Sequence, residues 1–174
     1  MTVATPRIRR ASHEDAAALA SLGRRIFAAT FAADNRPEDM AMYLDATYSP
    51  EHQAREIAHP ALAYFVAEAD DQIAGYALLR SGVAPPCVVT PRPLEVVRFY
   101  VDTPWHGSGV AQRLMDRCTT EGQQRAATAL WLGVWERNAR AIRFYAKAGF
   151  RDVGAQSFVL GTDVQKDRVM MRAL

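Results

Sequence analysis

A glycine-containing turn between a β-prone stretch and an amphipathic helix constrains this chain most. The stretch "LEVVRFYVD" (94–102) is rich in β-branched and aromatic residues, and "GVAQRLMDRC" (109–118) has apolar residues at helical spacing. Gly107 and Gly109 lie where the turn meets the helix, although glycine there costs backbone entropy on folding. Free amides at a helix start, together with the helix dipole, form a site for an anion.

Two well-known anion-binding turns match this one poorly. A P-loop requires Gly-Lys-Ser/Thr after its glycines, and "GSGVAQR" contains no such triplet. A dinucleotide-binding turn has the pattern GxGxxG, but here Gln112 occupies the third glycine position. That turn also opens its domain, whereas this one lies well past the middle of the chain.

Composition places the chain among globular proteins. Its 174 residues are 49% hydrophobic and 23% charged, which predicts one domain, 1–174, with a substantial core. No apolar run reaches the roughly 18 residues that span a bilayer, and the N-terminus lacks a secretion signal. The net charge of +2 includes no basic block. We therefore expect a cytoplasmic protein with neither a membrane nor a nucleic acid as partner.

The cysteines and histidines show no ligand spacing. Cys87 and Cys118 form no CxxC pair, so we expect ordinary thiols rather than a disulfide or a zinc site. No metal site is expected from the histidines either, which are His13, His52, His59 and His106.

The remaining pattern predicts the element order β-ααα-ββ-β-α-β-α-β-β, a mixed α/β sheet protein. Ser12 and Ser49 are good helix N-caps, and Asp70-Asp71 splits two apolar runs into a hairpin. The proline-rich segment 81–93 reads as a loop. Expected helices are 13–31, 37–48, 50–58, the one after Gly109, and 138–149; expected strands are 6–11, the hairpin 62–80, 94–102, 127–135, 150–160 and 165–174.

Two segments carry a family resemblance. "HGSGVA" resembles the coenzyme A-binding loop of the GNAT N-acetyltransferase superfamily, with Gly109 and Ala111 at its last two fixed positions. His106 stands where that loop usually has Gln or Arg. Downstream, "LWLGVWERNARAIRFYAKAGFRDVG" is similar to the second signature of the superfamily. The resemblance implies the GNAT fold, a mixed central sheet of about seven strands flanked by helices, and acetyl-CoA as co-substrate.

The same resemblance implies how the coenzyme would be held. Strand 99–101 would splay from its neighbour and leave main-chain groups for the pantetheine arm, because an unpaired buried amide costs about 1–3 kcal/mol. Asn138 would cap a helix and also contact this arm, and Lys147 would lie near the phosphates. The implied coenzyme-binding residues are Phe99, Tyr100, Val101, His106, Gly107, Ser108, Gly109, Val110, Ala111, Gln112, Asn138, Tyr145 and Lys147.

Acetyl transfer to an amine requires a base and a proton donor, since an alkylammonium has a pKa near 10.4. Glu95 lies where many superfamily members keep a glutamate base, although a strand-end carboxylate can simply face solvent. Tyr145 matches the tyrosine that protonates the departing thiolate, and the alternative is that Phe144 next door faces the thiol instead. A helix would point these two neighbours in different directions.

A narrower resemblance concerns the acceptor. "IFAATFAADNRPEDMAMYLDATYSPEHQAREI" looks like a bacterial branch described as spermidine/spermine N-acetyltransferases. A polycation needs carboxylates, and acidic residues gather here, although such residues at a helix start are usually solvated. The expected acceptor-binding residues are Phe31, Asn35, Glu38 and Asp39, with Asp34 and Asp45 nearby.

Three alternatives stay open at this stage. The acceptor could be a protein N-terminus or lysine, and the fold could serve as an acetyl-CoA-binding regulator without catalysis. The closing segment "DRVMMRAL" (167–174) could pair across a homodimer.

Overall fold

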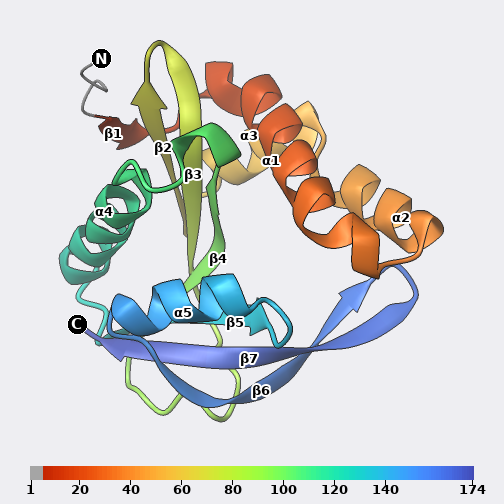
Figure 1. Cartoon of the computed structure of the whole chain (residues 1–174). Coiled ribbons are helices and arrows are strands. Elements are labelled where there is room, and N and C mark those ends of the chain that lie inside the picture. Colours follow the sequence, from red (N-terminus) through yellow and green to blue (C-terminus); the bar gives the residue numbers. More distant parts are fainter. Residues whose placement is uncertain (1–5) are drawn as a thin grey trace.

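The computed structural model describes residues 6–174, which form one mixed sheet of seven strands with helices on both faces (Figure 1). The strand order across the sheet is β1-β2-β3-β4-β5-β7-β6. The strands are β1 (Arg7–Arg10), β2 (Leu62–Ala69), β3 (Gln72–Ser81), β4 (Pro93–Val101), β5 (Ala129–Trp135), β6 (Arg151–Leu160) and β7 (Asp163–Ala173). The predicted α/β class and element order are confirmed.

Five α-helices connect these strands, and they begin where the capping residues predict. The side chains of Ser49 and Asn138 each accept a hydrogen bond from a first-turn N–H, at 3.1 and 3.2 Å. Ser12 and Asp15 form a capping box, but it opens a 3-10 turn ahead of the first helix. The helices are α1 (Ala16–Phe31), α2 (Pro37–Thr47), α3 (Pro50–Ala58), α4 (Val110–Gln124) and α5 (Ala139–Lys147).

The sheet opens between β4 and β5, its one parallel pair within residues 6–174. Their pairing joins Pro93–Glu95 to Ala129–Trp131 and then stops. Beyond this point β4 continues beside β3 as far as Val101, whereas β5 follows β7. A bulge at Val97 bends β4 in the same region. The expected splay of β4 from its neighbour is confirmed.

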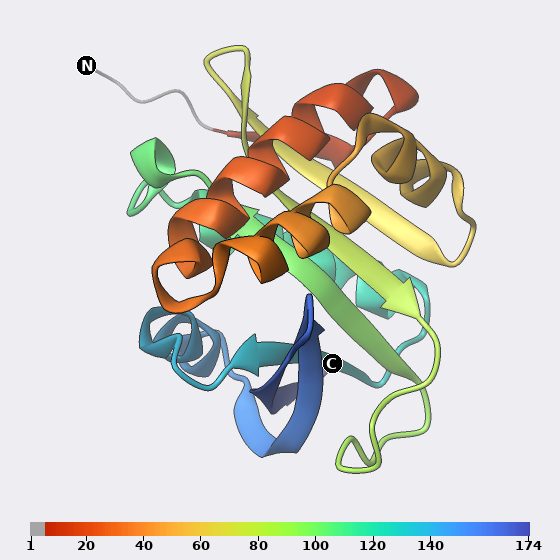
Figure 2. The same cartoon turned by 90° about the vertical axis from the view of Figure 1, so that its right-hand side faces the viewer.

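Helices cover the two faces of β2–β4 with separate apolar cores. On one face α4 packs Leu114 and Met115 against Phe65, all of them fully buried. On the other face α1 contributes Leu19, which packs beside Tyr76. Figure 2 shows α1 crossing the strands in front, on the face opposite α4. The splayed end of β4 therefore lies between α1 and α4.

The closing strand does not offer an edge for dimerisation. β7 lies between β5 and β6 and pairs with both along its length, so the expectation that 167–174 pairs across a dimer is wrong. Within the described chain, the sheet edges are β1 and β6. None of the described helices has the length and apolar character needed to cross a membrane.

Candidate active site at the sheet opening

The splay between β4 and β5 leads into a cavity of about 910 Å³. Its walls come from β4, the turn before α4, the start of α5, and the face of β5, β7 and β6 that looks toward α1 and α2. We call the part between α1, α2 and the β6–β7 hairpin the inner pocket. The inner pocket is lined by Phe27, Phe31, Tyr43, Phe158, Gln165 and Asp167.

The glycine turn has the conformation that only glycine adopts easily. Gly107 and Gly109 have φ values of +79° and +88°, in the left-handed region. A Cβ at either position would meet no heavy atom within 4 Å, so open space lies beside the turn. Gly109 is the N-cap of α4 and has no side chain to cap it, so the first N–H groups of α4 stay available to an anion.

The loop residues predicted to bind the coenzyme fall into two groups. Ser108 and Val110 do not line the cavity, because the Ser108 hydroxyl donates to the Trp105 carbonyl at 2.6 Å and Val110 is fully buried. These two residues can contribute only main-chain groups. The loop residues that line the cavity are His106, Gly107, Gly109, Ala111 and Gln112.

His106 ties the turn to the end of β4. Its Nε2 lies 2.8 Å from the main-chain oxygen of Val101. A carbonyl only accepts, so Nε2 carries the proton in this contact. The residue that replaces the usual Gln or Arg is exposed at the cavity wall and holds the loop in place.

The main chain of β4 provides a second polar surface. Phe99, Tyr100 and Val101 line the cavity, and β3 pairs with one edge of this segment. Beyond Glu95 the opposite edge has no strand neighbour among residues 6–174. Unpaired peptide groups beside a cavity favour an extended amide-bearing ligand, because leaving them unpaired is costly. The pantetheine arm of coenzyme A has this chemistry and fits here.

Glu95 lies where the two strands part, opposite Trp131 in the last pair of β4 and β5. Arg80 donates to its Oε2 from Nε and Nη2, at 2.9 and 2.6 Å. Its side chain is only 12% exposed and lines the cavity, so it is not a solvent-facing strand end. No described residue hydrogen bonds to Oε1, and this oxygen can accept a proton.

Tyr145 is buried in α5 and lines the cavity. Its ring meets those of Phe99 and Phe150 edge-on, at centroid distances of 6.1 and 5.8 Å. Burial raises the pKa of the phenol above its usual value, so the hydroxyl keeps its proton at neutral pH and can donate it. Phe144 also lines the cavity and stacks on Phe99 at 5.5 Å; which of the two residues faces the thiol stays a prediction.

The start and end of α5 differ in their access to the cavity. Asn138 caps the helix and also lines the cavity, which makes both of its predicted roles compatible. Lys147 is exposed in the last turn and is absent from the cavity wall. Arg140, in the first turn, lines the cavity and was not predicted.

Of the four predicted acceptor residues, Phe31 alone lies in the cavity wall. Asn35 and Glu38 lie outside it, and Asn35 donates to the Phe31 carbonyl at 2.7 Å. Asp39 is buried and accepts hydrogen bonds from the N–H and hydroxyl of Thr162, at 2.6 and 2.8 Å. Its Oδ1 therefore joins α2 to the β6–β7 turn, and the carboxylate lies outside the cavity wall.

The inner pocket contains a carboxylate that the sequence analysis missed. Asp167 on β7 is 7% exposed, and burial raises its pKa to about 6. Its side chain projects to the same face of β7 as those of the buried Val169 and Met171. The sequence contained one signal for this residue, namely a charged side chain at a strand position that faces the core.

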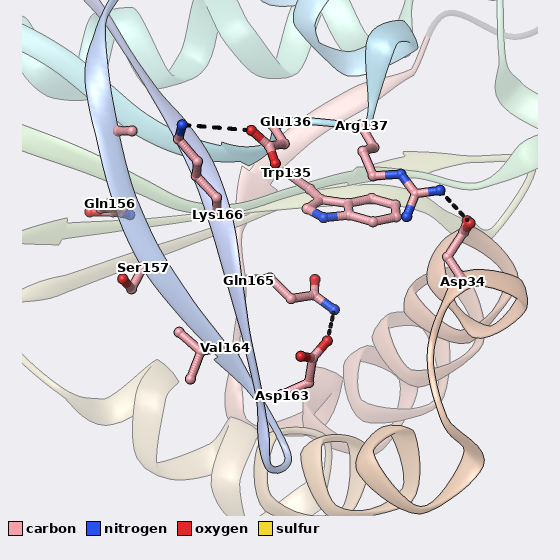
Figure 3. A pocket seen from close by; sticks show the side chains of 11 residues that line it. Asp34, Trp135, Glu136, Arg137, Gln156, Ser157, Asp163, Val164, Gln165 and Lys166 are labelled. Atoms are coloured by element: carbon pink, nitrogen blue, oxygen red, sulfur yellow. Dashed lines mark hydrogen bonds and ion pairs between the residues drawn. The ribbon is translucent and has the colours of Figure 1, made fainter.

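A second hollow adjoins the cavity, and we call it the outer groove (Figure 3). Arg137 reaches across its rim to Asp34 at 3.2 Å and stacks over the Trp135 ring at 5.1 Å. Figure 3 also shows Lys166 directed toward Glu136, 4.0 Å away. The residues that line both the outer groove and the cavity are Trp135, Gln156 and Gln165.

Metal ligands and reactive thiols are not features of this site. In the part of the chain that the structure describes, no three His, Cys, Asp or Glu side chains could together hold a metal ion. Cys118 is buried in the core, and burial raises the pKa of its thiol to about 12. Neither Cys87 nor Cys118 lines the cavity.

The site combines a splayed parallel strand pair, a main-chain anion site at the start of α4 and the buried phenol of Tyr145. Together these features are typical of an acyl-CoA N-acyltransferase. The model of the acetyltransferase (GNAT) family matches residues 16–150, and the chain belongs to this family.

Relatives and solved structures agree with this assignment. An uncharacterized N-acetyltransferase of Lactobacillus delbrueckii subsp. lactis is 35% identical over 163 residues, 94% of each chain. One of Mycobacterium tuberculosis is 35% identical over 160 residues, 92% of this chain and 98% of its own.

Two solved structures show the same fold at lower identity. A PaiA N-acetyltransferase of Thermoplasma acidophilum in complex with coenzyme A has a TM-score of 0.79 at 20% identity, covering 98% of this chain and 99% of its own. The ribosomal-protein-S18-alanine N-acetyltransferase of Escherichia coli has a TM-score of 0.68 at 17% identity, covering 97% and 94%. The chain is accordingly an N-acetyltransferase with acetyl-CoA as co-substrate.

Proposed function

We propose that this protein acetylates a primary amine by direct attack of the amine on acetyl-CoA. The observation that carries the proposal is that Glu95 and Tyr145, from separate elements, line one cavity at the strand opening. Acetyl-CoA supplies the acetyl group and a thiolate leaving group. No cysteine in residues 6–174 lines the cavity, which favours direct transfer over a covalent acetyl-enzyme.

The coenzyme is held mainly by main-chain groups in this proposal. Amides from Gly107 to Ala111, including those of Ser108 and Val110, bind the diphosphate, and Gln112 borders it. The open edge of Phe99–Val101 and the side chain of Asn138 hold the pantetheine arm. Lys147 approaches the phosphates only by extending over the surface, since it is exposed and outside the cavity wall.

Glu95 serves as the base and Tyr145 as the acid. An alkylammonium leaves only a trace of free amine at pH 7, and Oε1 of Glu95 is available to take the proton, directly or through water. Arg80 holds the other carboxylate oxygen and fixes the side chain. The Tyr145 hydroxyl has no hydrogen-bond partner among the described residues, which leaves its proton for the thiolate.

The polyamine acceptor implied by the sequence has limited structural support. The carboxylates expected to bind it, Glu38 and Asp39, lie outside the cavity wall. A peptide N-terminus is a second candidate, since the outer groove continues from the cavity. A regulator without catalysis is disfavoured by a buried phenol whose hydroxyl has no protein partner. A cytoplasmic location and a homodimer stay predictions from the sequence.

A thiol-release assay tests the proposal. Purified protein is mixed with acetyl-CoA and an amine panel, and coenzyme A binding is measured separately by calorimetry. We expect binding and amine-dependent release of free coenzyme A. Tight binding without acetylation of any amine would instead identify a regulator.

A further inference from the structure

Asp167 lies in a row of three side chains that crosses the sheet. In the strand register it is opposite Trp135 of β5 and Gln156 of β6. Directly opposed residues of antiparallel strands project to the same face, and all three of these side chains line the cavity. The carboxylate therefore faces the inner pocket from the floor formed by the sheet.

Gly133 lets the carboxylate of Asp167 lie close against the main chain of β5. A Cβ at Gly133 would lie 3.0 Å from Oδ2 of Asp167 and 2.6 Å from the side-chain nitrogen of Gln156. The backbone of Gly133 does not have a positive φ, so conformation does not require glycine here. Any side chain at position 133 would therefore displace these two polar groups.

The carboxylate of Asp167 makes no hydrogen bond or ion pair with another residue of 6–174. The ionisable groups that face it are the phenols of Tyr43 on α2 and Tyr100 on β4, and burial keeps both protonated. Its neighbours on β5 and β6, Trp135 and Gln156, are neutral. A buried carboxylate without a cation is costly, and a cation bound from solution would relieve that cost.

The other carboxylates of the cavity wall already have cations. Glu95 pairs with Arg80 at 2.6 Å, and Asp102 pairs with Arg25 at 2.7 Å. Among the described residues that line the cavity, Asp167 is thus the one carboxylate without an arginine partner.

Aromatic rings surround the space above Asp167. Phe27 stacks on Tyr43 at 4.5 Å, and Phe158 meets Tyr43 edge-on at 5.5 Å. Phe31 meets Trp135 at 5.7 Å. Such rings accept an apolar body and also favour a cation near their faces.

We propose that Asp167 binds the ammonium group of the entering acceptor before that group loses its proton at Glu95, and that the acceptor is a small primary amine with one positive charge and an apolar body. The assignment rests on the proposed acetyltransferase function and specifies its acceptor. The aromatic rings of the inner pocket hold the body. A polyamine would bring further positive charges to a cavity whose other carboxylates arginines already neutralise.

The test compares acetyl transfer to 2-phenylethylamine, to spermidine and to a short peptide with a free N-terminal alanine. Asp167→Asn removes the charge, and Gly133→Ala displaces the carboxylate and Gln156 while leaving the charge. Asp152→Asn is the matched control, since Asp152 is an exposed carboxylate of β6 paired with Arg168. Calorimetry of coenzyme A binding accompanies each variant.

We expect the wild type to have its highest kcat/KM with 2-phenylethylamine. Asp167→Asn raises the KM for this amine by about 10- to 100-fold, because a charged hydrogen bond is lost. Gly133→Ala raises it by about 10-fold, while Asp152→Asn and all coenzyme A affinities stay within about twofold of the wild type.

An unchanged KM in Asp167→Asn overturns the assignment, as does a higher wild-type kcat/KM for spermidine or for the peptide. A wild type that acetylates none of the three amines overturns the proposed function, and the assignment of Asp167 with it. Acetylation with an unaltered KM overturns the assignment of Asp167 alone.

Discussion

The imidazole of His106 donates to the main-chain oxygen of Val101 across 2.8 Å, which links the glycine turn before α4 to the end of β4. Replacing His106 with Ala removes this link and should weaken coenzyme A binding about 2- to 10-fold, the usual worth of one hydrogen bond. His106→Gln should retain most of the affinity, because an amide can donate to the same oxygen. Calorimetry measures both, with His13→Ala as an exposed control on the first 3-10 turn. Equal affinity of His106→Ala and the wild type would contradict the link.

The positive φ of Gly109 leads to a second prediction, which concerns the glycine turn before α4. Gly109→Ala places a Cβ where φ is +88°, which costs about 1–2 kcal/mol unless the turn moves. Coenzyme A affinity should fall by about fivefold or more as the amides shift. Gly82→Ala is the matched control, because Gly82 lacks a positive φ and its Cβ would meet nothing within 4 Å. Similar losses in both variants would argue against a role for the turn.

Tyr145→Phe separates catalysis from binding. The variant keeps the ring packing against Phe99 and Phe150 but removes the proton donor, so kcat should fall about 100-fold. Coenzyme A affinity should not change. Tyr64→Phe is the control, since the Tyr64 hydroxyl bonds to Gln53 away from the cavity. An unaltered kcat at saturating amine would remove Tyr145 from the mechanism.

The correct sequence predictions concern residues whose roles are local. Ser49, Asn138 and Gly109 act on the main chain within a few positions of themselves, so residue type and spacing predict what they do. The backbone of the glycine turn before α4 belongs to this class, whereas its binding of the coenzyme stays a prediction. The sheet opening was expected only from the family resemblance, because strand divergence depends on contacts between distant segments.

The acceptor side shows why the remaining site residues escaped prediction. Asp39 and Asn35 are near Phe31 in sequence, but α2 directs Asp39 toward the β6–β7 turn instead of the cavity. Asp167 reaches the inner pocket only because β7 inserts between β5 and β6. Closeness along the chain was a poor guide where long-range strand pairing decides which side chains meet.

The contact between Asp39 and Thr162 predicts a loss of stability. Asp39→Ala removes the buried carboxylate that accepts from the Thr162 N–H and hydroxyl, and it frees the β6–β7 turn from α2. We expect Tm to fall by about 3–8 °C in a thermal melt. Asp45→Ala, on the exposed side of the same helix, should change Tm little. Matching Tm shifts in the two variants would contradict the structural role of Asp39.

Asp167 makes the free energy of unfolding depend on pH in a defined direction. Its pKa is about 6 in the folded protein against an ordinary value of 3.8, so the unfolded chain ionises first as pH rises. The free energy of unfolding therefore falls as the pH rises from about 4 to about 6, because the folded state disfavours the charged form of Asp167.

Asp167→Asn has no charge to bury and should escape this loss. At pH 8 and without ligand, the variant should be about 1–2 kcal/mol more stable than the wild type in urea unfolding, after allowing for solvent in the cavity. At pH 4 the two should be equal. Asp152→Asn should show the opposite sign, since Arg168 lowers the pKa of Asp152 and its ionised form favours folding. A difference in stability between Asp167→Asn and the wild type that does not vary with pH would show that burial does not raise the pKa of Asp167.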